Sequence, residues 1–141
     1  MRERLFLLLI LVISSALLTY GAQSISISND EANIFFNETN LVHYLAVYST
    51  QLLGQNDFAL RLPFILLHLA SIVLLYKIGK IFLKKRIDRI VSVALYAFLP
   101  GVNGVALLVN SGIVVIFLSL LFTYFYLKEW KVASHSVLII C

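Results

Sequence analysis

The chain has 141 residues, of which 61% are hydrophobic and 13% are charged, and its net charge is +4. A soluble domain of this length is nearer half apolar and a quarter charged, so these polar residues would not cover a globule. The apolar residues come in long runs, which predicts an all-α, polytopic membrane protein with lipid as its solvent. The basic residues flank those runs, which favours a role in membrane topology over nucleic-acid binding. The only cysteine is the last residue, so an internal disulfide is excluded.

The first apolar run covers residues 5–22 and follows Arg2 and Arg4. A basic start and an apolar core also describe a cleaved signal peptide, but the residues that end this run make a poor small-x-small cleavage site. We therefore predict a retained first membrane span and keep the signal peptide as the alternative.

Residues 23–58 contain acids and no Lys or Arg, and we predict that they form an outer loop. Its start, residues 24–28, alternates with period two and is typical of extended chain. Residues 40–54 predict an amphipathic helix that lies on the membrane surface and stops at Gly54. The apolar positions that recur at helical spacing are Leu41, Leu45, Tyr48 and Leu52.

The remaining sequence predicts further spans that belong, with the first, to one membrane domain over residues 1–141. They are expected at about residues 60–83, 90–109, 112–127 and, in part, 132–141. Pro100-Gly101 and Gly104 interrupt one of them, and the charged stretch from Lys128 to Lys131 closes the next. Because a helical span needs about 20 residues, the last run is incomplete, and we expect the chain to be the N-terminal part of a longer protein.

The basic residues predict an orientation. With a cytoplasmic N-terminus, alternating spans place ten of the 11 Lys and Arg residues at or near the cytoplasmic face and leave only Arg61 outside. This distribution satisfies the positive-inside bias at every loop. We therefore expect an integral protein of the cell membrane, of the bacterial inner-membrane type.

The outer loop holds the candidates for chemistry, Asp30 and Glu31. A carboxylate at the bilayer surface can act as a general base on an acceptor hydroxyl or amine. Ser28 and Glu31 also have the spacing of a helix capping box, and acids suit a first helical turn. Both interpretations remain open on these residues alone.

The order of these pieces resembles the membrane-embedded GT-C glycosyltransferases, in particular the protein O-mannosyltransferases and the aminoarabinose transferases of lipid A. The resemblance covers nearly the whole chain and about the first third of a typical family member. The matching pieces are Asp30-Glu31-Ala32, Ala59-Leu60-Arg61-Leu62-Pro63 and Leu74-Leu75-Tyr76-Lys77-Ile78-Gly79-Lys80.

This resemblance implies an enzyme that moves a glycosyl group from a polyprenyl-phosphate-linked donor to a lipid, glycan or protein acceptor on the outer side of the bilayer. It also implies that Asp30 is the catalytic base or a metal-linked activator, supported by Glu31. The family often has a second acid in the next outer turn, but this chain has Asn110-Ser111-Gly112 there. We therefore predict no metal ligand, although a divalent cation is still conceivable as a cofactor.

Two further residues are candidates for substrate binding. Arg61 is either the partner of Asp57 in an i,i+4 ion pair or a contact to the carrier phosphate, which suits the fixed fork of a guanidinium. His43 is either a substrate contact or a solvated interfacial histidine. His68, inside the second span, predicts a hydrogen bond between helices.

The alternative to an enzyme is a non-catalytic membrane protein, such as an assembly subunit or a transporter fragment. A transporter is expected to have a broken span with charges near the bilayer midplane. Pro100-Gly101 offers the break, but no acid or base accompanies it.

Overall fold

The computed structural model describes the backbone of residues 2–37 and 39–140 and the side chains of residues 3–37 and 39–130. Over these residues the chain is helical apart from turns and contains no strand, which confirms the all-α prediction. The helices are α1 (Arg2–Ser24), α2 (Asn29–Asn37), α3 (Leu41–Leu53), α4 (Asp57–Phe82), α5 (Arg86–Phe98), α6 (Pro100–Leu107) and α7 (Ser111–Ile140).

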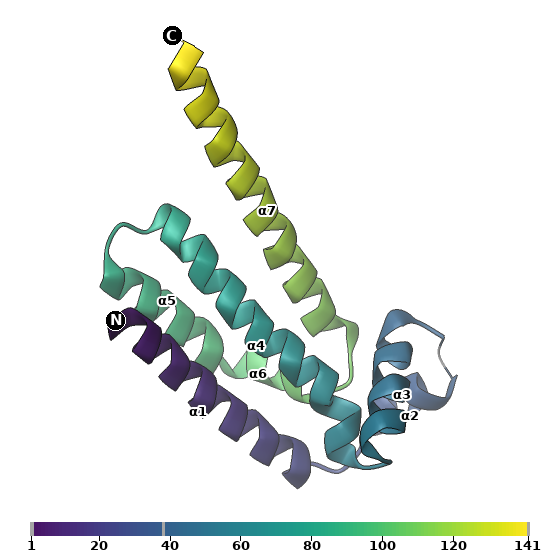
Figure 1. Cartoon of the computed structure of the whole chain (residues 1–141). Helices are drawn as coiled ribbons and strands as arrows, with labels where there is room; N and C mark the ends of the chain where they lie inside the picture. The colour runs from purple at the N-terminus through teal and green to yellow at the C-terminus, as the bar shows by residue number, and fades with distance from the viewer. Residues whose placement is uncertain (1, 38, 141) are drawn as a thin grey trace.

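Helix α4 is the centre of the bundle and contacts α1, α3, α5, α6 and α7. Helices α1 and α5 run alongside it, and α7 leaves the bundle at an angle (Figure 1). The short helices α2 and α3 lie at the end of the bundle opposite the N-terminus and the α4–α5 loop (Figure 1). The predicted outer loop is therefore a compact helical cap at one end of the bundle.

Three helices are long and apolar enough to cross a membrane: Glu3–Ser24, Asp57–Phe82 and Ser111–Trp130. The span predicted at residues 90–109 instead consists of α5 and α6, which pass the same test only as a pair and are bent by 52°. Leu99 separates them in an extended conformation (ψ 119°). Pro100 explains the break, because proline has no N–H to donate and disfavours helical backbone at the residue before it.

Helix α7 passes through the charged segment that the sequence places at the end of a span. The segment from Lys128 to Lys131 is predicted to close a membrane span, and α7 continues through it as one helix from Ser111 to Ile140. The sequence from Ile113 to Ile140 contains neither Gly nor Pro, and charged residues alone do not stop a helix. The end of the predicted partial span, Cys141, lies outside the described residues.

The bundle has two apolar clusters, one toward each end of α4. In the cluster nearer α2 and α3, Leu18, Ala46, Phe64 and Ile113 bring together α1, α3, α4 and α7. In the other, α1, α4 and α5 meet through residues such as Ile72. Because both ends of α4 are packed, the helical cap has a fixed place relative to the spans.

Glu3 joins the first and fifth helices at the basic end of the bundle. Its carboxylate Oε1 lies 2.9 Å from the Nε of Arg86 and 2.5 Å from an Nη of Arg89. Its other oxygen accepts a hydrogen bond from the Tyr76 hydroxyl at 3.3 Å. This acid therefore offsets part of the positive charge that gathers there.

Helix α3 begins and ends where the sequence predicts. The Asn40 side chain accepts a hydrogen bond from the His43 N–H at 2.9 Å, as an N-cap does. The helix stops at Gly54, whose φ of +91° is a conformation that favours glycine. Of the stretch predicted as extended chain, residues 24–28, Ser24 is the last residue of α1 and residues 25–28 are irregular.

Pro63 leads to a specific bond between α3 and α4. Proline has no N–H, so the carbonyl four residues earlier, that of Ala59, loses its helical partner. Ala59 is fully buried, and the Ser49 hydroxyl from α3 donates a hydrogen bond to this carbonyl. The proline in the Arg61-Leu62-Pro63 sequence therefore creates the acceptor that holds α3 in place.

We expect Ser49→Ala to destabilise the protein, because it leaves the buried Ala59 carbonyl without a donor. The cost of such a group is about 1–3 kcal/mol, measurable as a lower unfolding midpoint in detergent. The matched control is Ser92→Ala on α5, an exposed serine that bonds only within its own helix. Equal midpoints for the two variants would contradict the assigned role of Ser49.

Candidate functional site

The first turn of α2 is closed by the predicted capping box. The Ser28 N–H donates to Glu31 Oε2 at 3.0 Å, and the Glu31 N–H donates to the Ser28 hydroxyl oxygen at 3.2 Å. These reciprocal bonds satisfy two N–H groups that a helix start otherwise leaves without partners. The capping interpretation of Glu31 is therefore confirmed.

Glu31 also forms a buried ion pair with Arg61 from α4. The Arg61 side chain is 0% exposed and that of Glu31 is 1% exposed. An Nη of Arg61 donates to Glu31 Oε2 at 2.7 Å, and its Nε donates to Oε1 at 3.0 Å. Two parallel charge-assisted bonds of this kind hold both side chains in one orientation.

The other donors of Arg61 all reach the end of α1 and the chain that follows it. Nη1 donates to the carbonyl oxygens of Ala22 at 3.0 Å and Ile25 at 2.6 Å, and Nη2 donates to that of Ser26 at 3.1 Å. With the two bonds to Glu31, all five N–H donors of the guanidinium are used. Arg61 therefore fastens the exit of α1 to the start of α4.

The carboxylate of Glu31 reaches a fourth element, the turn between α6 and α7. The backbone N–H of Val109 donates to Glu31 Oε1 at 3.0 Å. Burial disfavours the charged form of Glu31, but the hydrogen bonds from Arg61, Ser28 and Val109 outweigh it and hold its pKa below the usual value. Glu31 is thus an ionised structural acceptor whose lone pairs are occupied.

This geometry corrects one interpretation of Arg61. The i,i+4 pair with Asp57 is wrong, because the guanidinium turns into the protein toward Glu31. An exposed i,i+4 pair stabilises a helix by only a few tenths of a kcal/mol, roughly 0.2–0.5. Five bonds in a buried site are stronger, so the longer-range partner is preferred.

Asp30 differs from Glu31 in its exposure and in its bonding. A helix turns by about 100° per residue, so the two adjacent acids of α2 face different ways. The Asp30 side chain is exposed, and no hydrogen bond or ion pair involves it in the described part of the chain. Its backbone is nevertheless held by the anchored residue beside it. The structure therefore presents one free carboxylate on a rigid turn.

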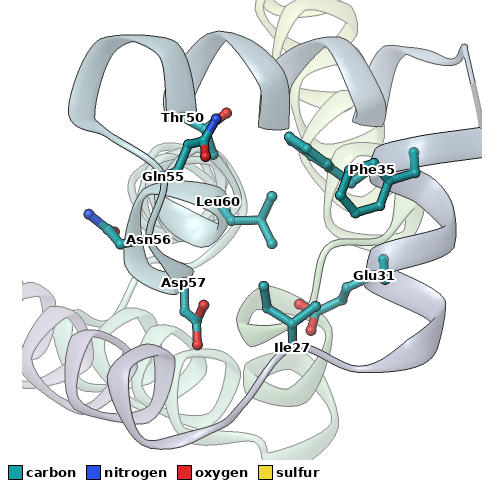
Figure 2. A pocket seen from close by; sticks show the side chains of 10 residues that line it. Ile27, Glu31, Phe35, Thr50, Gln55, Asn56, Asp57 and Leu60 are labelled. Atoms are coloured by element: carbon teal, nitrogen blue, oxygen red, sulfur yellow. The ribbon is translucent and has the colours of Figure 1, made fainter.

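A cavity of about 260 Å³ lies between α2, α3 and the start of α4, with Glu31 in its wall. Figure 2 shows Leu60 and Asp57 on one side of it, facing Ile27, Glu31 and Phe35 across the cavity. Asp30 does not line this cavity, so the free carboxylate and the cavity occupy neighbouring parts of the same helical cap.

His43 lies between the two short helices. Its Nδ1 is 3.3 Å from the carbonyl oxygen of Ile34, and its ring packs against Phe35 and Tyr44. The ring is half-buried and joins α2 to α3, and its interpretation as a solvated interfacial histidine stays open. Its predicted contact with substrate stays a prediction.

The family model of the dolichyl-phosphate-mannose-protein mannosyltransferases matches residues 37–141. The chain belongs to this family of membrane glycosyltransferases. The matched region contains α3 and the Arg61-Leu62-Pro63 segment of α4, whereas Asp30 and Glu31 precede it. Neither the curated proteins nor the solved structures contain a match to the chain.

Membership of this mannosyltransferase family confirms the resemblance to GT-C enzymes and an integral membrane location. Within the described residues, no three His, Cys, Asp or Glu side chains gather as a metal site would require. In the turn between α6 and α7, Asn110 accepts a hydrogen bond from the Gly112 N–H at 2.8 Å, so its side-chain oxygen shapes the turn.

Sequence reasoning missed how the site is assembled. The Ser-x-x-Glu pattern and the lone outer cation were both visible, but their connection spans 30 residues in sequence. Val109 contributes only its backbone N–H, so its residue type gives no indication of this bond. Arg61 is the only Lys or Arg in residues 23–76, and this was the one clue that it would partner an acid of the predicted outer loop.

We expect strong coupling between Glu31 and Arg61 in a double-mutant cycle. Glu31→Leu or Arg61→Met alone leaves one buried charge without its partner and costs about 3–5 kcal/mol of unfolding free energy. The double variant removes both charges, so its loss is smaller than the sum of the single losses. Additive losses, measured by denaturant unfolding in detergent, would contradict the pairing.

The stability that depends on Glu31 should be lost in acid. Its folded pKa lies below its usual value of 4.5, so ionised Glu31 stabilises the folded state above that pH, and the effect disappears as pH falls through the folded pKa. The measurement is the difference in unfolding free energy between the unmodified protein and Glu31→Gln. This difference should be constant at neutral pH and shrink in acid. A difference that grows on acidification would contradict the lowered pKa of Glu31.

Proposed function

We propose that this chain provides the outer catalytic segment of an enzyme that transfers a glycosyl group from a polyprenyl-phosphate-linked donor to an acceptor on the extracytoplasmic side. The observation that carries this proposal is the free Asp30 carboxylate on a turn anchored by the buried Glu31–Arg61 pair. Family membership supports the class of reaction. A rigid, exposed acid beside a membrane is suited to act on an acceptor that arrives from outside.

The proposed topology puts the N-terminus in the cytoplasm of a bacterial cell and the helical cap outside. Helices α1, α4, the bent pair α5–α6 and α7 then make four spans of one membrane domain. The support is the charge distribution: ten of the 11 Lys and Arg residues fall on the cytoplasmic side of this arrangement.

Helix α3 is proposed to rest on the outer membrane surface as an amphipathic helix. Its buried face packs on α4 through Val42, Ala46 and Thr50. Its opposite face exposes large apolar and aromatic side chains, which suit the boundary between headgroups and acyl chains. These exposed residues are Leu41, Tyr44, Tyr48 and Leu52.

In the proposed reaction, Asp30 accepts the proton of the acceptor hydroxyl as its oxygen attacks the anomeric carbon of the sugar. The new bond joins that carbon to the acceptor oxygen. The bond that breaks joins the same carbon to the carrier phosphate, which leaves with the electron pair as polyprenyl phosphate. A positioned base typically contributes about 10²–10⁴-fold to such a step.

Glu31 and Arg61 take positioning roles in this proposal. All four acceptor positions of Glu31 and all five donors of Arg61 are occupied by the protein itself. A phosphate contact by Arg61 would have to break bonds that close the cap, so the geometry favours its structural role. His43 has Nε2 left for a substrate hydroxyl, since its Nδ1 faces Ile34.

We expect Asp30→Asn to lower kcat for glycosyl transfer by about 10²–10⁴-fold without a change in the unfolding midpoint, because the side chain is exposed and makes no bond within the described chain. The assay uses membranes that contain the protein, a polyprenyl-phosphate sugar and a candidate acceptor. The matched control is Asp88→Asn, an equally exposed acid at the opposite, basic end of the bundle.

Unchanged transfer by Asp30→Asn would refute its catalytic role. A non-catalytic subunit would keep the buried Glu31–Arg61 pair but would not need Asp30. Loss of transfer in Asp30→Asn together with normal transfer in Asp88→Asn therefore separates the enzyme from that alternative.

A further inference from the structure

The cavity between α2, α3 and α4 has an apolar side and a polar side. Ile27 and Phe35 make the apolar side with Leu60, and Figure 2 shows these side chains pointing toward the cavity. The polar side includes Thr50 and Gln55, above the cavity in the same view, and Asp57, whose carboxylate lies at its lower edge. Such a mixed wall can take a ligand that has both C–H and hydroxyl faces.

The polar side chains of the cavity wall have hydrogen-bond donors and acceptors that are free to bind a ligand. Thr50 donates its hydroxyl hydrogen to the Val47 carbonyl at 2.9 Å, which leaves its oxygen free to accept. In the described part of the chain, no hydrogen bond or ion pair involves the side chains of Gln55 or Asp57. The cavity therefore offers several acceptor oxygens and an amide donor.

The charge of the cavity wall limits the class of ligand that the cavity can bind. Glu31, in the cavity wall, is neutralised by Arg61. Asp57 is then the uncompensated charge among the lining residues, so an anionic group such as the carrier phosphate is repelled. A simple cation would bind the oxygens of Asp57, Gln55 and Thr50, but it would leave the amide donor of Gln55 and the apolar side of the cavity without partners. A neutral group with several hydroxyls uses all three.

We infer that this cavity is the acceptor subsite and binds a hydroxyl-rich ring, such as a sugar of an acceptor glycan or glycolipid. The inference rests on the proposed transfer reaction and names its acceptor. Asp57 accepts hydrogen bonds from ring hydroxyls, and Phe35 packs on the C–H face. The volume of about 260 Å³ is below the roughly 300 Å³ at which cavities for drug-sized ligands begin, so it suits one ring.

A labelling experiment tests occupancy without any need for activity. Cys141→Ser removes the only thiol of the 141-residue sequence, and Phe36→Cys places a thiol at the cavity wall, where the native side chain is 77% exposed. The rate of modification by a membrane-impermeant maleimide is measured with methyl glucoside, methyl galactoside or methyl mannoside. Gln51→Cys, on an exposed part of α3 that does not line the cavity, is the matched control.

We expect at least one of these glycosides to slow labelling of Phe36→Cys but not of Gln51→Cys, and Asp57→Asn to abolish that protection. Absence of protection by all three glycosides would overturn the inference. Protection by ethylammonium in place of the glycosides would also overturn it, because the site would then be one for cations.

Kinetics distinguish this inference from the proposed function. In the transfer assay, Asp57→Asn should raise KM for the acceptor about tenfold, since a hydrogen bond to a charged group is lost, with kcat and the donor KM unchanged. Asp57→Glu, which keeps the charge, should restore part of the affinity. A fall in kcat or a rise in the donor KM would overturn the acceptor role. If Asp30→Asn keeps full activity, the proposed catalysis fails, whereas the labelling result still decides what the cavity binds.

Discussion

A carboxylate and a guanidinium that are removed from water stay charged only if every lone pair and every N–H finds a partner, and the Glu31–Arg61 pair meets this condition. The partners come from the end of α1, the first turn of α2, the start of α4 and the α6–α7 turn. The first two of these segments are neighbours in the sequence, whereas the start of α4 and the α6–α7 turn are distant from them, so the two buried charges join three separate parts of the chain. An arrangement that separated these segments would leave a buried charge short of hydrogen bonds.

This constraint separates two adjacent acids that look equivalent in sequence. Glu31 faces inward and its oxygens are fully hydrogen-bonded within the protein, while Asp30 faces outward on the same turn. A general base must be free to take a proton and must also be held in place. The arrangement provides both properties, because the anchor belongs to one residue and the free carboxylate to the next.

Local signals in the sequence were enough for the parts of the fold that depend on neighbours along the chain. The capping box at Ser28, the start of α3 at Asn40 and its stop at Gly54 all use bonds over a few residues, and the apolar runs of α1 and α4 need only length and composition. The charged residues Lys128–Lys131, which are predicted to close a membrane span, do not end the helix, because the chain there contains no Gly or Pro.

The site itself depends on contacts between distant segments, which is why the sequence predicted its members better than its geometry. Asp57 was the obvious partner for Arg61 at a spacing of four, but burial favours Glu31, 30 residues away. The bond from Ser49 to the Ala59 carbonyl could be understood only once the missing N–H of Pro63 was placed against α3. Packing between distant segments determines these partners, and the periodicity of apolar residues in the sequence does not predict them.

The bonds from Arg61 to three carbonyl oxygens at the end of α1 have a consequence for the order of assembly. During synthesis, the segment from Ala22 to Glu31 leaves the ribosome well before Arg61, and Val109 follows later still. Until α4 has inserted, Glu31 is a hydrated ion. The carbonyl oxygens at the end of α1 still lack the hydrogen bonds that Arg61 later donates to them. The helical cap therefore completes its fold only when its downstream neighbours are in place, because α4 and the α6–α7 turn supply bonds that the earlier segments lack.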